Sequence, residues 1–169
     1  ASLGTPAAEK SLLNALPKAE GKGTLVNALA QFRSPATVQA LAALLPDPEV
    51  GQLAARSLAT IGGPAAVQAL AGELATGKDA ARRQWLSEAL LAGADDAKLA
   101  ADVRATSLRL VMTQGTPTAQ LAGAGALLRH QADPAALAKI LGAAQSPKAS
   151  ERTQAATLLG ELVQRRGIT

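Results

Sequence analysis

The stretch PATVQALA at residues 35–42 returns 29 residues later as PAAVQALA at residues 64–71. A proline opens each copy. Proline is common at the first position of a helix, because a backbone N–H at that position would have no hydrogen-bond partner within the helix. Apolar side chains stand three, six and ten residues after each proline, a spacing that lines one face of a helix. This period predicts a stack of repeated helical units rather than a domain built around one central core.

Weaker copies of the unit extend to both ends of the chain. Stepping back by 29 residues reaches Pro6, and Pro134 opens a similar unit near the other end, with a less regular opening at Asp95 between them. A second helix in each unit is indicated by one column of leucines: Leu29, Leu58, Leu90, Leu127 and Leu159. The sequence therefore predicts an all-α fold, an α-solenoid in which about five helix pairs form a right-handed superhelix.

We expect one domain over residues 1–169. Its repeats are expected at approximately 6–33, 35–62, 64–93, 95–131 and 134–166. The expected helices cover residues 6–17, 23–33, 35–45, 48–61, 64–75, 78–92, 96–113, 117–130, 134–144 and 147–166. The pattern over 96–113 is blurred, and we expect a break near Asp102. Glu9 stands where the better repeats have Val38 and Val67, which we interpret as the polar face of a terminal repeat.

Composition agrees with a helical stack. Hydrophobic residues make up 48% of the chain, yet it holds one Phe, one Trp and no Tyr, so leucine, alanine, valine and isoleucine must form the core. Alanine and leucine are also strong helix formers. Because the sequence has no signal peptide and no apolar run of membrane-spanning length, we expect a soluble protein, either cytoplasmic or exported with other domains. Since the chain begins with Ala1, we expect a domain or fragment of a larger protein.

A recognisable pattern follows the first clear helix. It reads PDPEV at 46–50, then Ala54-Ala55, Leu58 and Ile61-Gly62-Gly63. This resembles the second helix of HEAT repeats, particularly the short bacterial kind first noted in phycobilin lyases, and the resemblance is strongest over 35–93. It implies a curved scaffold whose second helices line a concave surface and bind another protein or protein segment. Family repeats usually carry an arginine where Gly51 stands here, so the family's Asp/Arg ladder is incomplete.

Five residues on two expected second helices form our candidate binding site. Gln52 and Arg56, like Gln84 and Glu88, are four residues apart, so each pair lies along one helix face. Their mixed polarity suits hydrogen bonding to a peptide better than neutralisation of phosphates. Trp85, the only tryptophan, is either a partly buried packing residue or an apolar anchor at one edge.

The sequence contains no pattern of residues typical of a catalytic or metal site. Cysteine is absent, which excludes disulfides, thiolate zinc sites and a cysteine nucleophile. His130 is the only histidine, and we expect it on the surface at a helix end. Asp95, Asp96 and Asp102 form the one acidic cluster, and we interpret Asp95 or Asp96 as a helix N-cap, with the acids near the positive end of the helix dipole. We expect no catalytic residue, no metal ligand and no cofactor.

Two other function classes stay open. One is an enzyme or enzyme subunit like the HEAT-like lyases, which would need a deep apolar groove with a convergent acid. The other is a nucleic-acid binder, since the net charge is +4. The candidate stripe for it is Arg82-Arg83, Arg104, Arg109, Arg129, Arg152 and Arg165-Arg166. We expect most of these arginines on solvated helix faces and do not expect nucleic acid as the partner, because aromatic residues for base stacking are nearly absent. The sequence does not indicate an oligomeric state.

Overall fold

The computed structural model describes residues 5–94 and 99–166, and within these ranges it has ten α-helices, one short 3-10 helix and no strand. The α-helices are α1 (Pro6–Ala15), α2 (Lys22–Leu29), α3 (Pro35–Ala43), α4 (Gly51–Ile61), α5 (Gly63–Thr76), α6 (Ala80–Gly93), α7 (Ala101–Gln114), α8 (Pro117–His130), α9 (Pro134–Ala144) and α10 (Ala149–Arg166). The 3-10 helix η1 covers Leu16–Lys18. The all-α solenoid is confirmed.

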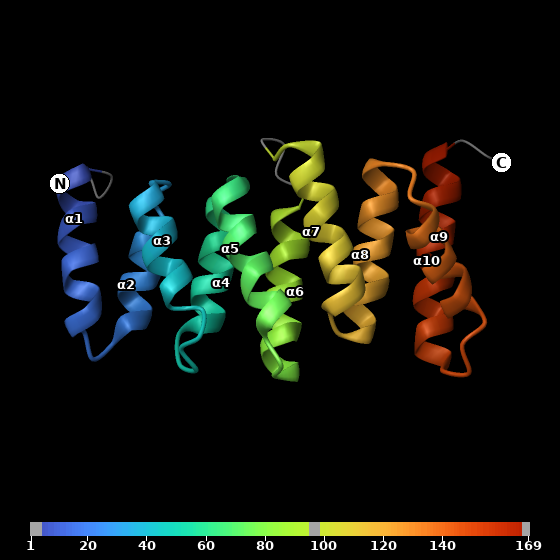
Figure 1. Ribbon diagram of the computed structural model, residues 1–169, viewed down its shortest axis with the longest axis horizontal. Helices are drawn as coiled ribbons and strands as arrows, with labels where there is room; N and C mark the ends of the chain where they lie inside the picture. Colours follow the sequence, from blue (N-terminus) through green and yellow to red (C-terminus); the bar gives the residue numbers. More distant parts are fainter. Residues whose placement is uncertain (1–4, 95–98, 167–169) are drawn as a thin grey trace.

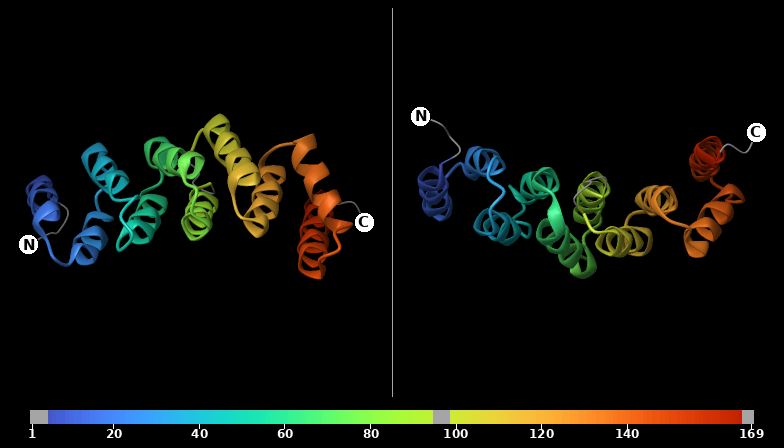
Figure 2. Two further views of the ribbon diagram at one scale, coloured as in Figure 1. Left: turned by 60° about the horizontal axis from the view of Figure 1, so that its bottom comes forward. Right: turned by 90° about the horizontal axis from the view of Figure 1, so that it is seen from above.

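Consecutive helices pair, and the pairs stand side by side from the N-terminus to the C-terminus (Figure 1). The first helices of the pairs (α1, α3, α5, α7 and α9) form one layer, and the second helices (α2, α4, α6, α8 and α10) form the other. Seen from above, the layer of second helices lies on the inner side of a shallow arc (Figure 2). The second helices therefore line the concave face, as the HEAT resemblance implies. The right-handed sense of the superhelix stays a prediction.

Hydrogen bonds from side chains fix the starts of several helices. Thr5, Ser34 and Asp133 each precede a proline and accept a hydrogen bond from the backbone N–H three residues on. Each bond satisfies one of the N–H groups that the first turn of a helix leaves without a partner. Side-chain caps therefore define the starts of α1, α3 and α9.

Several helix boundaries differ from the prediction, most of all the end of α2 and the start of α7. Helix α2 ends at Leu29 rather than at residue 33, because the chain turns there and buries Phe32 against the stack. Helix α7 begins at Ala101 rather than at residue 96, since Ala100 is extended and the buried Leu99 lies outside the helix. The helix then runs without a break, and Asp102 lies in its first turn, near the positive end of the helix dipole. Asp95 and Asp96 lie outside the described residues.

The core is repeated along the stack. Leu29, Leu58, Leu90 and Leu127 are fully buried in their shared column, and Leu159 in α10 is half-buried. Met112 is buried in the core of the second half of the stack. Each helix contacts its neighbours rather than a common centre, so the stability of the stack comes from interfaces between adjacent helices.

Two glycines let α8 pack closely on both sides. A Cβ atom on Gly123 would lie 3.2 Å from the backbone nitrogen of Met112 in α7. A Cβ atom on Gly125 would lie 2.5 Å from Cδ2 of Leu158 in α10. Glycine inside a helix weakens it by roughly 0.5–1 kcal/mol relative to alanine. Here that loss is offset by the close approach of the two neighbouring helices.

One rung of the Asp/Arg ladder is formed by a lysine. Lys22 of α2 lies 3.1 Å from Oδ2 of Asp47, at the start of the next unit's second helix. The other oxygen of Asp47 accepts a hydrogen bond of 2.9 Å from the backbone N–H of Glu49. The Glu49 hydrogen bond and, after it, the Lys22 ammonium hold the pKa of Asp47 below its usual range.

Candidate functional site

A groove runs between α4 and α6, two adjacent helices of the concave layer. It has a volume of about 470 Å³ and is lined by Arg56, Ala59 and Thr60 of α4 and by Trp85, Glu88, Ala89 and Ala92 of α6. The three alanines leave room for a bound chain to approach the helix backbones closely. The larger polar and aromatic side chains surround them, so the groove combines small apolar contacts with hydrogen-bonding groups.

The structure brings three of the five sequence-predicted residues together in this groove. Arg56, Trp85 and Glu88 line it, whereas Gln52 and Gln84 are exposed one turn earlier on their helices. Gln84 still acts on the groove, because its side-chain nitrogen donates a 3.2 Å hydrogen bond to Oε1 of Glu88. That bond orients the Glu88 carboxylate while leaving its other oxygen to accept from a ligand.

Trp85 packs on the core and also lines the groove. Its side chain is half-buried and packs against the hydrophobic core. Its remaining surface lines the groove. An aromatic ring held by the core presents a flat apolar surface without losing much conformational entropy on binding, which is typical of anchor residues at interfaces.

Sequence reasoning missed Thr60 and the alanines of the groove. Thr60 lies four residues after Arg56, so the helical spacing that selected Gln52 and Arg56 extends to it. Its hydroxyl donates a 3.0 Å hydrogen bond to the carbonyl oxygen of Arg56 and keeps its lone pairs available. The alanines could not be distinguished in the sequence, because the chain contains many alanines. They form the floor of the groove only because α4 and α6 pack side by side.

Comparison with known proteins bears on this part of the chain. Residues 9–91 match the family model of HEAT repeats. They belong to the HEAT-repeat family. The match covers α4 and the whole groove except Ala92. HEAT repeats are typically protein-interaction and scaffold modules. No curated protein and no solved structure matches the chain.

Beyond the matched residues, the second half of the molecule continues the same stack of helix pairs. Helices α7 to α10 form two further pairs, each packed on the pair before it. Among the described residues, no helix is long and apolar enough to cross a membrane. Residues 5–94 and 99–166 also contain no group of three or more His, Cys, Asp or Glu side chains placed to hold a metal ion.

Four arginines of the candidate nucleic-acid stripe bind other parts of the helical stack. Arg82 lies 2.9 Å from Oε1 of Glu73 and donates a 2.6 Å hydrogen bond to the Pro46 carbonyl of the preceding repeat. Arg104, Arg109 and Arg152 likewise donate to carbonyl or carboxylate oxygens beside helix ends. Arg82, Arg104 and Arg152 satisfy backbone carbonyl groups near helix ends, and Arg109 pairs with the Asp133 carboxylate. Their charges are therefore less available to a phosphate backbone.

A second hollow of about 650 Å³ lies between the C-terminal ends of α8 and α10. It is lined by Arg129, His130, Glu161, Gln164 and Arg165, and His130 ends α8 as predicted. Its cations stand beside the last turns of two helices, where they offset the negative end of each helix dipole. A role in stabilising these helix ends accounts for the cluster.

Proposed function

We propose that this HEAT-repeat chain is a non-enzymatic scaffold that binds a segment of another protein on its concave face. The observation that carries this proposal is the groove between α4 and α6, where Arg56, Trp85 and Glu88 converge. The family supports it, since HEAT repeats are typically protein-interaction modules. The volume of about 470 Å³ falls within the usual range for binding pockets and suits a few side chains of an extended segment.

The chemistry of the groove favours a peptide of mixed character. Trp85 offers a surface for one apolar side chain. Arg56 donates to a carboxylate or a backbone carbonyl of the peptide, and Glu88 accepts from a backbone N–H or a lysine. Gln52 and Gln84 extend the hydrogen-bonding surface by one helical turn. The preferred segment therefore carries an apolar residue flanked by an acidic and a basic side chain.

The test compares two variants of equal composition. The first replaces Gln52, Arg56, Gln84 and Glu88 with alanine. The second replaces with alanine four residues that are exposed outside the groove: Glu20, Arg33, Gln39 and Gln68. Both variants are first shown to melt like the wild type and are then used, with it, to capture partners from the source cell. We expect the first variant to lose partners that the wild type and the second variant retain.

Equal recovery by both variants would refute the groove as the binding site. A captured partner is then fragmented and titrated against the chain, with the fluorescence of Trp85, the single tryptophan, as the readout. A segment that binds in the groove changes this emission, whereas one bound elsewhere leaves it unchanged. The nucleic-acid alternative would instead be supported if no protein is captured and if the chain binds nucleic acid with an affinity that falls steeply as the salt concentration rises.

A further inference from the structure

The hollow between α8 and α10 occupies the same place between its helices as the groove between α4 and α6. The two helices contact each other, and the volume of the hollow is about 650 Å³. In the groove, Thr60 and Ala92 stand two residues after the leucine column, and in the hollow Arg129 and Glu161 stand at that same position. Because all four helices belong to the inner layer of the arc (Figure 2), both spaces open on the concave face.

Two arginines of this hollow differ from those that bind the helical stack. Among residues 5–94 and 99–166, the side chains of Arg129 and Arg165 make no hydrogen bond and no ion pair, even with Glu161, the carboxylate in the same lining. Their place beside helix ends uses their charge, but each guanidinium also carries five N–H donors in a plane that fits a carboxylate. These donors are therefore available to a ligand, and we call this space the basic hollow.

The basic hollow adjoins a space with an apolar wall. Arg129 and Arg165 also line this second space of about 470 Å³, together with Leu128 and Leu162. A single phosphate or free carboxylate would fill only a small part of the two spaces. Among their described lining residues there is no Phe, Tyr or Trp on which a nucleic-acid base could stack. Two guanidinium groups beside an apolar wall suit a protein segment with acidic and apolar side chains.

We propose that the basic hollow binds an acidic stretch of the same protein segment whose apolar residue occupies the groove between α4 and α6. The acidic stretch adds a second feature to the partner, and its link to the apolar residue rests on the proposed function of the groove. Neighbouring packed helices are about 8–10 Å apart, so the two steps from the groove to the hollow cover about 20 Å. An extended chain covers this distance with about six residues. The partner therefore carries acidic residues about six positions away from its apolar anchor.

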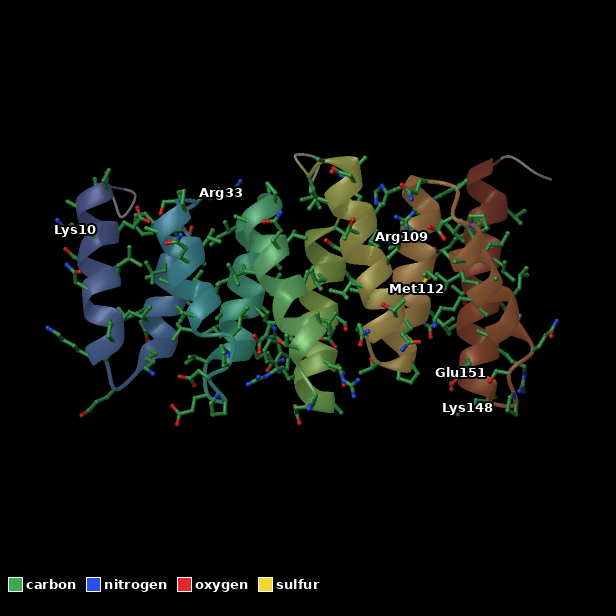
Figure 3. All side chains as sticks on the ribbon, in the orientation of Figure 1. Lys10, Arg33, Arg109, Met112, Lys148 and Glu151 are labelled. Carbon is green, nitrogen blue, oxygen red and sulfur yellow. The ribbon has the colours of Figure 1, made fainter. Side chains whose placement is uncertain are left out.

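A labelled peptide of six glutamates tests the basic hollow without the groove. Fluorescence polarisation at low salt is expected to show binding of this peptide and no binding of the matching peptide of six glutamines. The double variant Arg129→Gln/Arg165→Gln should bind the glutamate peptide about tenfold more weakly. Lys10→Gln/Arg33→Gln is the matched control, because it removes the same charge from exposed side chains in the other half of the stack (Figure 3). Both variants are first shown to melt like the wild type.

Two results of this experiment would overturn the proposal. Equal weakening by the two double variants would mean a general attraction to the net charge, and a glutamate peptide that binds no better than the glutamine peptide would mean no acidic site. A single-stranded oligothymidylate that binds more tightly at the same arginines would assign the hollow to nucleic acid instead. Arg129→Lys/Arg165→Lys keeps the charge at both helix ends and replaces the glutamine variant if that variant melts early. It should also weaken binding, because lysine lacks the planar fork.

A linked peptide tests whether the groove and the basic hollow hold one segment. It carries a leucine, a spacer of six glycine and serine residues and three glutamates, and it is expected to bind more tightly than a peptide with a spacer of two. Its binding should change the emission of Trp85, which lines the groove. A changed emission with full affinity in Arg129→Gln/Arg165→Gln would overturn the hollow and leave the groove in place. An unchanged emission with reduced affinity in that variant would refute the groove and the single segment, while acid binding at the hollow would stand.

Discussion

Arg109 of α7 donates two hydrogen bonds to a single carboxylate oxygen of Asp133, of 3.0 Å from Nε and 2.9 Å from Nη2. The other oxygen of Asp133 accepts a 3.0 Å hydrogen bond from the backbone N–H of Ala136 and so caps α9. The Ala136 hydrogen bond and, after it, the Arg109 guanidinium hold the pKa of Asp133 below its usual range. The Asp133 carboxylate thus caps α9, the first helix of the fifth repeat, and also binds α7, the first helix of the fourth repeat, through Arg109.

Replacing Asp133 is therefore expected to cost more than the loss of a helix cap. Asp79 is the matched control, because it caps α6 through a 2.7 Å hydrogen bond from the Arg82 N–H, at an exposed site. Thermal melts should show a clearly larger drop in Tm for Asp133→Ala than for Asp79→Ala. In a cycle with Arg109→Ala, the Asp133 and Arg109 effects should be strongly non-additive. Equal drops and additive effects would mean that the Arg109 contact contributes nothing.

The leucine column should be most sensitive in the middle of the stack. Leu58 is fully buried, so Leu58→Ala removes buried surface and leaves a cavity, at a cost of about 2–5 kcal/mol of unfolding free energy. Leu162 is only half-buried in the last helix, and Leu162→Ala should cost less. Urea denaturation of both variants measures the difference. An equal or reversed order would contradict a stack stabilised through its inner interfaces.

Glycine to alanine substitutions should have opposite effects at two helix-interior sites. Gly72 is exposed in α5 and a Cβ atom there would meet nothing within 4 Å, so Gly72→Ala should stabilise the protein by roughly 0.5–1 kcal/mol. Gly123 is buried, and a Cβ atom there would press on the α7 backbone. Gly123→Ala should therefore give no increase in stability, or should destabilise the protein. Chemical denaturation at one temperature measures both, and a comparable gain at Gly123 would refute the close packing of α7 and α8.

The Glu9 contact predicts a specific dependence of stability on pH. Hydrogen bonds from Ser34 and then Thr37 lower the pKa of Glu9 in the folded state. A lowered folded pKa stabilises the protein above the unfolded pKa, and this contribution disappears as the pH falls through the folded value. Stability should therefore decline in acid, below about pH 4. Glu9→Gln should make that decline shallower in a series of denaturant midpoints, and an identical slope would argue against the contact.

The predicted and observed helices agree best where local signals are strong. The starts of α3 and α9 follow from a cap residue and a proline, two neighbours in sequence whose effect needs no tertiary contact. The start of α7 at Ala101 did not follow: Ala100 is extended, and Arg104 donates hydrogen bonds to the carbonyl oxygens of Ala94 and Leu99, contacts that no local signal announces. For the candidate site, spacing alone selected Arg56 and the α6 residues, while the groove itself needed two packed helices.

By itself, the sequence determined the all-α stack and its buried leucine column. The 29-residue period and the helical spacing of apolar residues can both be recognised from the order of residues alone, without knowing any contact between distant parts of the chain. Only the tertiary structure decided what each polar or small residue does. Glu9 joins two repeats and Arg109 binds a carboxylate 24 residues away, while the alanines at 59, 89 and 92 become a groove floor. Such roles depend on which atoms the folded chain brings within a few ångströms, and a repeat pattern specifies the helices without specifying those distances.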